Sequence, residues 1–169
     1  STGNFAPPPG NAAGIDVINV DAGSYEAMDW IFPPYYLGDA PLLADIAVVK
    51  RAVSIPVIAV GNMTPEAGEV ALRAGSADFI AIGRGLIADP ELPEKARSGR
   101  VQDIRPCIRC NDGCMARGDH LAKTISCSVN VAVCREEEFK ITKAERSKKV
   151  AVVGGGPAGM EAARVCALK

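Results

Sequence analysis

The chain has 169 residues, of which 48% are hydrophobic and 23% are charged, and its net charge is −1. This length and apolar content suit one or two folded domains and exclude a disordered polymer. A net charge near zero gives no electrostatic footprint for nucleic acid, and no apolar run approaches the length of a membrane span. The chain opens without methionine and ends within a predicted helix at Lys169, so we expect a piece of a longer protein.

Residues 1–13 are rich in proline and glycine, and they are predicted to form a flexible arm. The elements expected after the arm are a strand at 14–21, a long loop at 22–39, a helix at 42–53, a strand at 56–60, a helix at 64–74, a strand at 78–82 and a helix at 89–99. Each strand is almost wholly apolar, which is typical of a parallel sheet built from βα units. The sequence therefore predicts an α/β fold.

The segment 105–135 holds four cysteines with the spacing C-x2-C-x3-C-x12-C: Cys107, Cys110, Cys114 and Cys127. Thiolates are soft ligands that suit an iron–sulfur cluster or a structural zinc ion. A tight triplet with one remote ligand favours the cluster, because zinc sites with four cysteines usually show two C-x2-C pairs. Zinc remains the alternative. Disulfides are disfavoured because no secretory signal opens the chain, and the same observation predicts a cytoplasmic protein.

Two of the predicted strands end in a glycine followed by a polar residue, namely Gly61 with Asn62 and Gly83 with Arg84. In (β/α)₈ barrels, phosphate sites lie in the loops after the last strands. Glycine lets backbone N–H groups approach phosphate oxygens, and arginine adds a charge-assisted hydrogen bond. The alternative is a pair of ordinary strand–turn–helix glycines with a surface arginine, and the pattern alone does not decide between the two.

A charged linker at 136–148 precedes Lys149–Val153, which is predicted to be a new strand. Gly154, Gly156 and Gly159 then form the pattern G-x-G-x-x-G before a predicted helix. This order of strand, glycines and helix is the context that a dinucleotide fingerprint requires. The pyrophosphate would lie at the helix N-terminus, where free N–H groups and the helix dipole favour an anion.

Five of the eight aromatic residues lie in the long loop: Tyr25, Trp30, Phe32, Tyr35 and Tyr36. On the catalytic face of a barrel, such a loop would enclose a flat, apolar substrate and a flavin ring. Tyr25 is the candidate proton donor. The alternative is a loop that packs only on itself.

Taken in order, these motifs resemble the iron–sulfur flavoenzymes that join an old-yellow-enzyme-type FMN barrel to an FAD/NAD-binding domain, such as 2-enoate reductase, 2,4-dienoyl-CoA reductase and trimethylamine dehydrogenase. The resemblance begins at about residue 14 and rests on the runs 19–26, 56–61, 78–84, 107–127 and 152–163. It implies the C-terminal βα units of a TIM barrel at 14–104, an iron–sulfur loop at 105–135, a linker at 136–148 and the start of a Rossmann-like FAD/NAD(P)-binding domain at 149–169.

The resemblance also implies roles for the candidate residues. FMN phosphate would be held by Gly61, Asn62, Gly83 and Arg84. A 4Fe–4S cluster would be held by Cys107, Cys110, Cys114 and Cys127, and FAD pyrophosphate by Gly154, Gly156 and Gly159. Tyr25 stands where the dienoyl-CoA reductases carry an active-site histidine, which implies proton transfer or substrate orientation.

The implied enzyme passes electrons from NAD(P)H through FAD, the cluster and FMN to an activated C=C bond of an unsaturated acid or acyl-CoA. The longer protein of which this chain is expected to be a part is expected to be homo-oligomeric. Two alternatives stay open: amine oxidation with a partner flavoprotein as acceptor, as in trimethylamine dehydrogenase, and a non-catalytic electron-transfer or zinc-binding module. The family barrel has eight strands and only the last three are recognisable here. We therefore expect this chain alone to be inactive and to bind FMN weakly or not at all.

Overall fold

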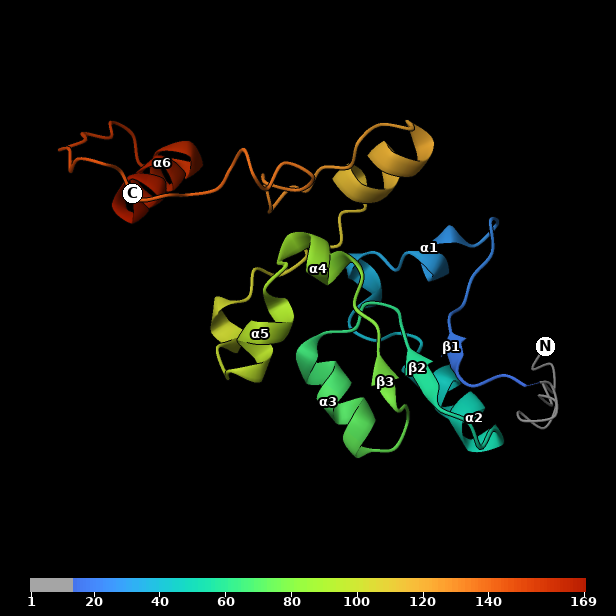
Figure 1. Cartoon of the computed structure of the whole chain (residues 1–169). Helices are drawn as coiled ribbons and strands as arrows, with labels where there is room; N and C mark the ends of the chain where they lie inside the picture. The colour runs from blue at the N-terminus through green and yellow to red at the C-terminus, as the bar shows by residue number, and fades with distance from the viewer. Residues whose placement is uncertain (1–13) are drawn as a thin grey trace. The chain divides into compact units, whose positions relative to one another are not determined.

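A computed structural model describes residues 14–169, so the arm predicted at 1–13 lies outside the described residues. The chain divides into two compact units, Ser1–Val133 and Cys134–Lys169. The first unit contains the sheet and most of the helices, and the second contains one helix, α6 (Figure 1).

The first unit is built on a parallel sheet of three strands in the order β1-β2-β3. The strands are β1 (Ile18–Val20), β2 (Val57–Ala59) and β3 (Phe79–Ile80). Ile58 of the central strand is in register with Asn19 on one side and with Phe79 on the other. The predicted α/β fold with parallel strands is therefore confirmed, although each strand is shorter than its apolar run.

Each strand is joined to the next by a helix, α2 (Leu43–Ala52) after β1 and α3 (Pro65–Arg73) after β2. The start of α3 follows the predicted pattern, because the Thr64 side chain caps it by accepting the Ala67 N–H at 3.2 Å and proline occupies the first turn. Both helices contribute to one core with β2: Leu42, Ile46, Val57, Ala59, Met63, Ala71 and Ala77. Burial of this apolar face against the sheet stabilises the unit.

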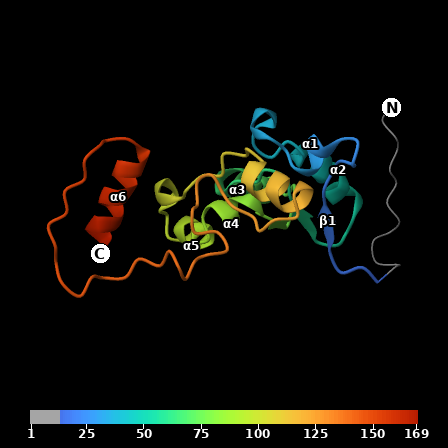
Figure 2. The same cartoon turned by 90° about the horizontal axis from the view of Figure 1, so that it is seen from above.

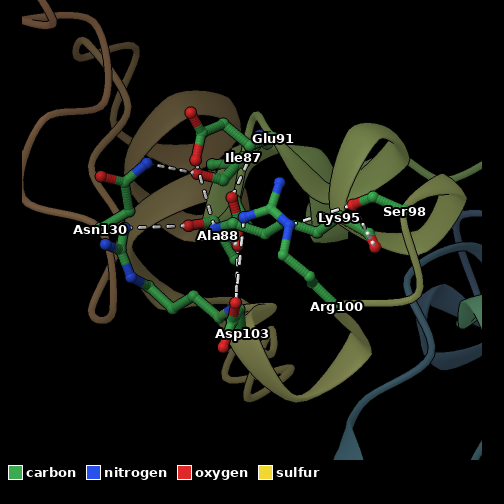
Figure 3. A network of polar contacts seen from close by, with 10 residues as sticks. Ile87, Ala88, Glu91, Lys95, Ser98, Arg100, Asp103 and Asn130 are labelled. Atoms are coloured by element: carbon green, nitrogen blue, oxygen red, sulfur yellow. Dashed lines mark hydrogen bonds and ion pairs between the residues drawn. The ribbon is translucent and has the colours of Figure 1, made fainter.

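After β3 the chain forms two short helices, α4 (Arg84–Ala88) and α5 (Leu92–Arg97), and a 3₁₀ turn, η2 (Val101–Asp103). The sequence predicts one helix at 89–99, so the prediction omits α4 and starts the second helix too early. The physical reason is that α4 has five residues, one of them glycine, and so is too short to show a helical pattern in the sequence. A network of hydrogen bonds and ion pairs joins this region, with Lys95, Glu91 and Asn130 among its members (Figure 3).

The long loop and the cysteine segment, both predicted as irregular, contain short helical turns. The loop holds α1 (Met28–Ile31) and the 3₁₀ turn η1 (Tyr35–Leu37), and the cysteine segment holds the π-helix η3 (Asp112–His120). Residues of α1 and η3 line a common cavity of about 340 Å³. Accordingly η3, drawn in gold, lies at the same end of the unit as α1 and α4 (Figures 1 and 2).

In the second unit, α6 (Pro157–Leu168) begins directly after Gly156, as the glycine pattern predicts. The strand predicted at Lys149–Val153 is wrong for this structure, since the described residues 134–169 contain no strand. A strand forms only by pairing its N–H and C=O groups with a neighbour, and this unit offers no second strand. Throughout the described part of the chain, every helix is too short or too polar to cross a bilayer.

Candidate functional site

A cavity of about 490 Å³ lies where the chain leaves the three strands. Its lining includes Asp21 after β1, the segment 60–66 after β2 and the segment 81–85 after β3. Carboxyl ends of parallel strands are the usual place for ligands in α/β proteins. All four residues predicted to hold a phosphate, which come from two separate strand ends, line this one cavity: Gly61, Asn62, Gly83 and Arg84.

The turn after β2 requires a glycine at its first position. Gly61 has a φ of +102°, and a Cβ there would lie 3.0 Å from the buried Leu42 side chain. The next residue, Asn62, also has a positive φ of 45°, and its amide donates to the Gly38 carbonyl at 3.1 Å. A side chain at position 61 would therefore strain the backbone and press on Leu42 of the core.

Three arginines of the described part of the chain line the cavity, namely Arg84, Arg105 and Arg109, and Arg84 is the one that follows a strand end directly. Its Nη2 group donates to the Pro33 carbonyl at 2.9 Å and to Asn62 Oδ1, and its Nη1 group donates to Asn111 Oδ1. Burial lowers its pKa, an effect that nearby cysteine thiolates partly oppose. Within residues 14–169 it forms no ion pair with a carboxylate, and its hydrogen-bond acceptors are neutral oxygens. A partly buried guanidinium in this state suits a phosphate group.

The cysteine segment folds back on itself beside Arg84. The Ser126 N–H donates to the Gly113 carbonyl at 2.9 Å, and Gly113 packs so tightly on Ser126 that a Cβ would overlap its carbonyl group. These contacts bring together the runs that carry Cys114 and Cys127. Cys110 Sγ lies 3.6 Å from the Ser128 hydroxyl. These contacts therefore bring the runs that carry Cys110, Cys114 and Cys127 side by side.

The thiols themselves do not converge in this structure. All six cysteines are free, and the described residues contain no group of three or more His, Cys, Asp or Glu side chains arranged to hold a metal ion. Hydrogen bonds from the Asp112 N–H and from Ser128 lower the pKa of Cys110, whereas burial raises the pKa of Cys114. The donor chemistry of four thiols fits a cluster, and the side-chain positions do not yet form its coordination sphere.

Three side-chain contacts attach the cysteine segment to α4. Asn111 accepts from Arg84, Asn130 donates to the Ile87 carbonyl at 2.9 Å, and Arg105 donates to the Ala88 carbonyl at 3.3 Å. Figure 3 shows the second contact, with Asn130 and Ile87 labelled. Sequence reasoning missed both asparagines, and the only signal for Asn111 was its place between Cys110 and Cys114.

Of the five aromatic residues in the long loop, Phe32 is the one that lines the cavity. Tyr25 is 91% exposed on a turn and lines neither cavity, so its position gives the predicted role as proton donor no support. The Tyr36 hydroxyl donates to Asp29 at 2.8 Å, and this hydrogen bond raises the pKa of Tyr36. The loop packs partly on itself, which is the alternative considered from the sequence.

The glycine pattern of the second unit forms a tight turn at the start of α6. Gly154 has a φ of +114°, and a Cβ on Gly159 would overlap the Gly154 carbonyl. Around Gly156, which precedes the helix, the space for a Cβ is open. These are the features by which such glycines allow a turn, close helix packing and the approach of a pyrophosphate.

The chain resembles known proteins along most of its length. Residues 11–103 match the NADH:flavin oxidoreductase / NADH oxidase family. A cinnamate reductase of Clostridium sporogenes is 45% identical over 159 residues, 94% of this chain and 24% of that protein. An NADH oxidase of Thermoanaerobacter brockii is 46% identical over 155 residues, 89% of this chain and 24% of that protein.

Among solved structures, a complex of 2-naphthoyl-CoA reductase with 2-naphthoyl-CoA superposes with a TM-score of 0.82 at 33% identity, covering 90% of this chain and 23% of that one. The chain thus spans about a quarter of the length of these relatives. The family match covers more than half of the chain and includes the strands and the cavity residues that follow them. The chain belongs to the NADH:flavin oxidoreductase / NADH oxidase family.

Proposed function

We propose that the chain is part of an NAD(P)H-dependent flavin oxidoreductase that reduces activated C=C bonds of small unsaturated acids or acyl-CoA thioesters. The observation that carries the proposal is Arg84, a partly buried cation without a carboxylate partner among residues 14–169, in a cavity at the strand ends. The similarity to a cinnamate reductase and to a 2-naphthoyl-CoA reductase supports the substrate class.

In this proposal the FMN phosphate is held by Gly61, Asn62, Gly83 and Arg84. Arg84 would donate to the phosphate oxygens, and the backbone N–H groups of the turns at Gly61 and Gly83, which line the cavity, would approach them. The N-terminal turn of α3, which also lines the cavity, would add the positive end of its helix dipole. FMN bound there would supply hydride transfer, and the chain's own part is to position its phosphate end.

We further propose that residues 14–104 are the last βα units of a TIM barrel, that the segment 105–135 holds a 4Fe–4S cluster, and that residues 149–169, after the linker 136–148, begin an FAD/NAD(P)-binding domain. The cluster ligands would be Cys107, Cys110, Cys114 and Cys127. The FAD pyrophosphate would lie against Gly154, Gly156 and Gly159. A one-electron carrier between two flavins would couple a nicotinamide donor to a distant acceptor.

Anaerobic turnover by the full-length protein tests the reaction class. We expect oxidation of NADH or NADPH that depends on a cinnamate-type acid or an unsaturated acyl-CoA, with one equivalent of saturated product. A parallel assay on the same protein replaces the unsaturated acid with trimethylamine and an artificial electron acceptor. Turnover of trimethylamine without reduction of any C=C substrate would contradict the proposal and identify amine oxidation instead.

A further inference from the structure

Asn111 connects parts of the first unit that are far apart in the sequence. It follows Cys110, has a φ of +55° and precedes η3 without capping it, so its side chain is available for tertiary contacts. Asparagine tolerates this left-handed conformation better than most residues. Its Nδ2 group donates to the Phe32 carbonyl at 2.8 Å, and its Oδ1 atom accepts from Arg84 Nη1.

The same guanidinium is held at its other end by the Pro33 carbonyl and by Asn62 Oδ1. Its acceptors are therefore one backbone carbonyl and two neutral amides. An aspartate at either asparagine position would pair with Arg84 and cancel the charge that an anion needs. The two asparagines fix the orientation of the guanidinium and leave its positive charge available.

We infer that Asn111 is a positioning residue: by orienting Arg84, it couples the fold of the cysteine segment to phosphate binding in the strand-end cavity. The inference rests on the proposed FMN phosphate site. Because such coupling is reciprocal, the free energy by which FMN stabilises the folded segment 107–127 should equal the free energy by which that folded segment strengthens FMN binding. Riboflavin lacks the phosphate, so it should not stabilise the segment, and the segment should not strengthen riboflavin binding.

The test compares FMN with riboflavin on the flavin-stripped full-length protein. Asn111→Ala removes one hydrogen bond to a charged group, so FMN affinity should fall about tenfold while riboflavin affinity is unchanged. Asn130→Ala is the matched control, since Asn130 also attaches the cysteine segment to α4 but bonds to the Ile87 carbonyl instead of Arg84. It should leave the FMN-to-riboflavin affinity ratio unchanged.

Hydrogen exchange supplies a second readout. In the wild type, FMN should slow exchange in residues 107–127 more than riboflavin does, and this difference should disappear in Asn111→Ala. If Asn111→Ala does not fold, Asn111→Asp gives the same comparison, because its carboxylate keeps the side-chain size, pairs with Arg84 and should lower the affinity ratio.

If the folded Asn111 variant kept the wild-type FMN-to-riboflavin affinity ratio, or if Asn130→Ala lowered that ratio equally, the inference would be overturned. The proposed phosphate site would be unaffected by either result. A wild-type protein that binds riboflavin as tightly as FMN would overturn both the inference and the proposed phosphate site.

Discussion

Replacing Asp89 with asparagine should destabilise the protein by about 3 kcal/mol near neutral pH. Asp89 is 3% exposed, and its carboxylate accepts from Lys95 Nζ at 2.6 Å and from the backbone N–H groups of Arg105 at 2.8 Å and Glu91 at 3.1 Å. Asparagine keeps an acceptor oxygen but removes the charge. Breaking a buried pair costs about 3–5 kcal/mol, and we expect the lower end because Lys95 also lies 3.4 Å from the Glu91 carboxylate.

The dependence of stability on pH in acid tests the same contact between Asp89 and Lys95. Burial acts to raise the pKa of Asp89, but hydrogen bonds from Lys95 and the two N–H groups outweigh it and hold the pKa below its ordinary value of 3.8. The carboxylate therefore stabilises the fold fully above about pH 3.8, and this stabilisation is lost as the pH falls through the lowered folded-state pKa. The gap between wild type and Asp89→Asn should be complete near neutral pH and shrink in acid.

Urea unfolding measures both effects, with Glu91→Gln as the matched control. Glu91 pairs with the same Lys95, but its side chain is 76% exposed, so the control should cost less than about 1 kcal/mol. The reasoning would be refuted if Asp89→Asn cost no more than Glu91→Gln, or if its cost were the same in acid as near neutral pH.

Three further changes test the core, the cavity and the cysteine segment. Ile46→Ala, at a fully buried core position, should lower the free energy of unfolding in urea by about 2–5 kcal/mol. Val48→Ala, on the exposed face of the same helix, should lower it by less than about 1 kcal/mol. Equal losses in the two variants would contradict the packing of α2 on the sheet. Arg84→Leu should weaken FMN binding roughly 10- to 100-fold in fluorescence titrations. Arg97 is an exposed arginine of a helix, and Arg97→Leu should leave FMN affinity unchanged. Equal FMN affinities in the two variants would show that Arg84 does not bind the phosphate. Cys114→Ser should lose most of the iron, and wild-type iron content would exclude it as a ligand.

The parts of the fold that could be predicted carry strong local signals. The Thr64 cap and Pro65 define the start of α3, and the apolar run around Val57 defines the central strand. By contrast, α4 and η3 are held by contacts between distant segments, such as that of Asn130 with Ile87. Single-sequence patterns carry no information about such contacts.

The same distinction applies to the site. Glycine at a strand end is a local signal, and Gly61 and Arg84 do lie on one cavity. The asparagine contacts of Arg84 could not be predicted, because they depend on how the cysteine segment folds back. The exposure of Tyr25 was also not predicted, because the residue type and its place in an aromatic loop do not show whether its side chain faces the cavity. The predicted strand at Lys149–Val153 failed because a strand needs a neighbour that its own sequence does not specify.

Cofactor analysis of the full-length protein, purified without oxygen, tests the central claim most directly. The proposed function predicts about one FMN, about one FAD, about four irons and about four acid-labile sulfides per chain. About one zinc per chain, with no sulfide and no flavin, would contradict it and identify the four cysteines as a structural zinc site.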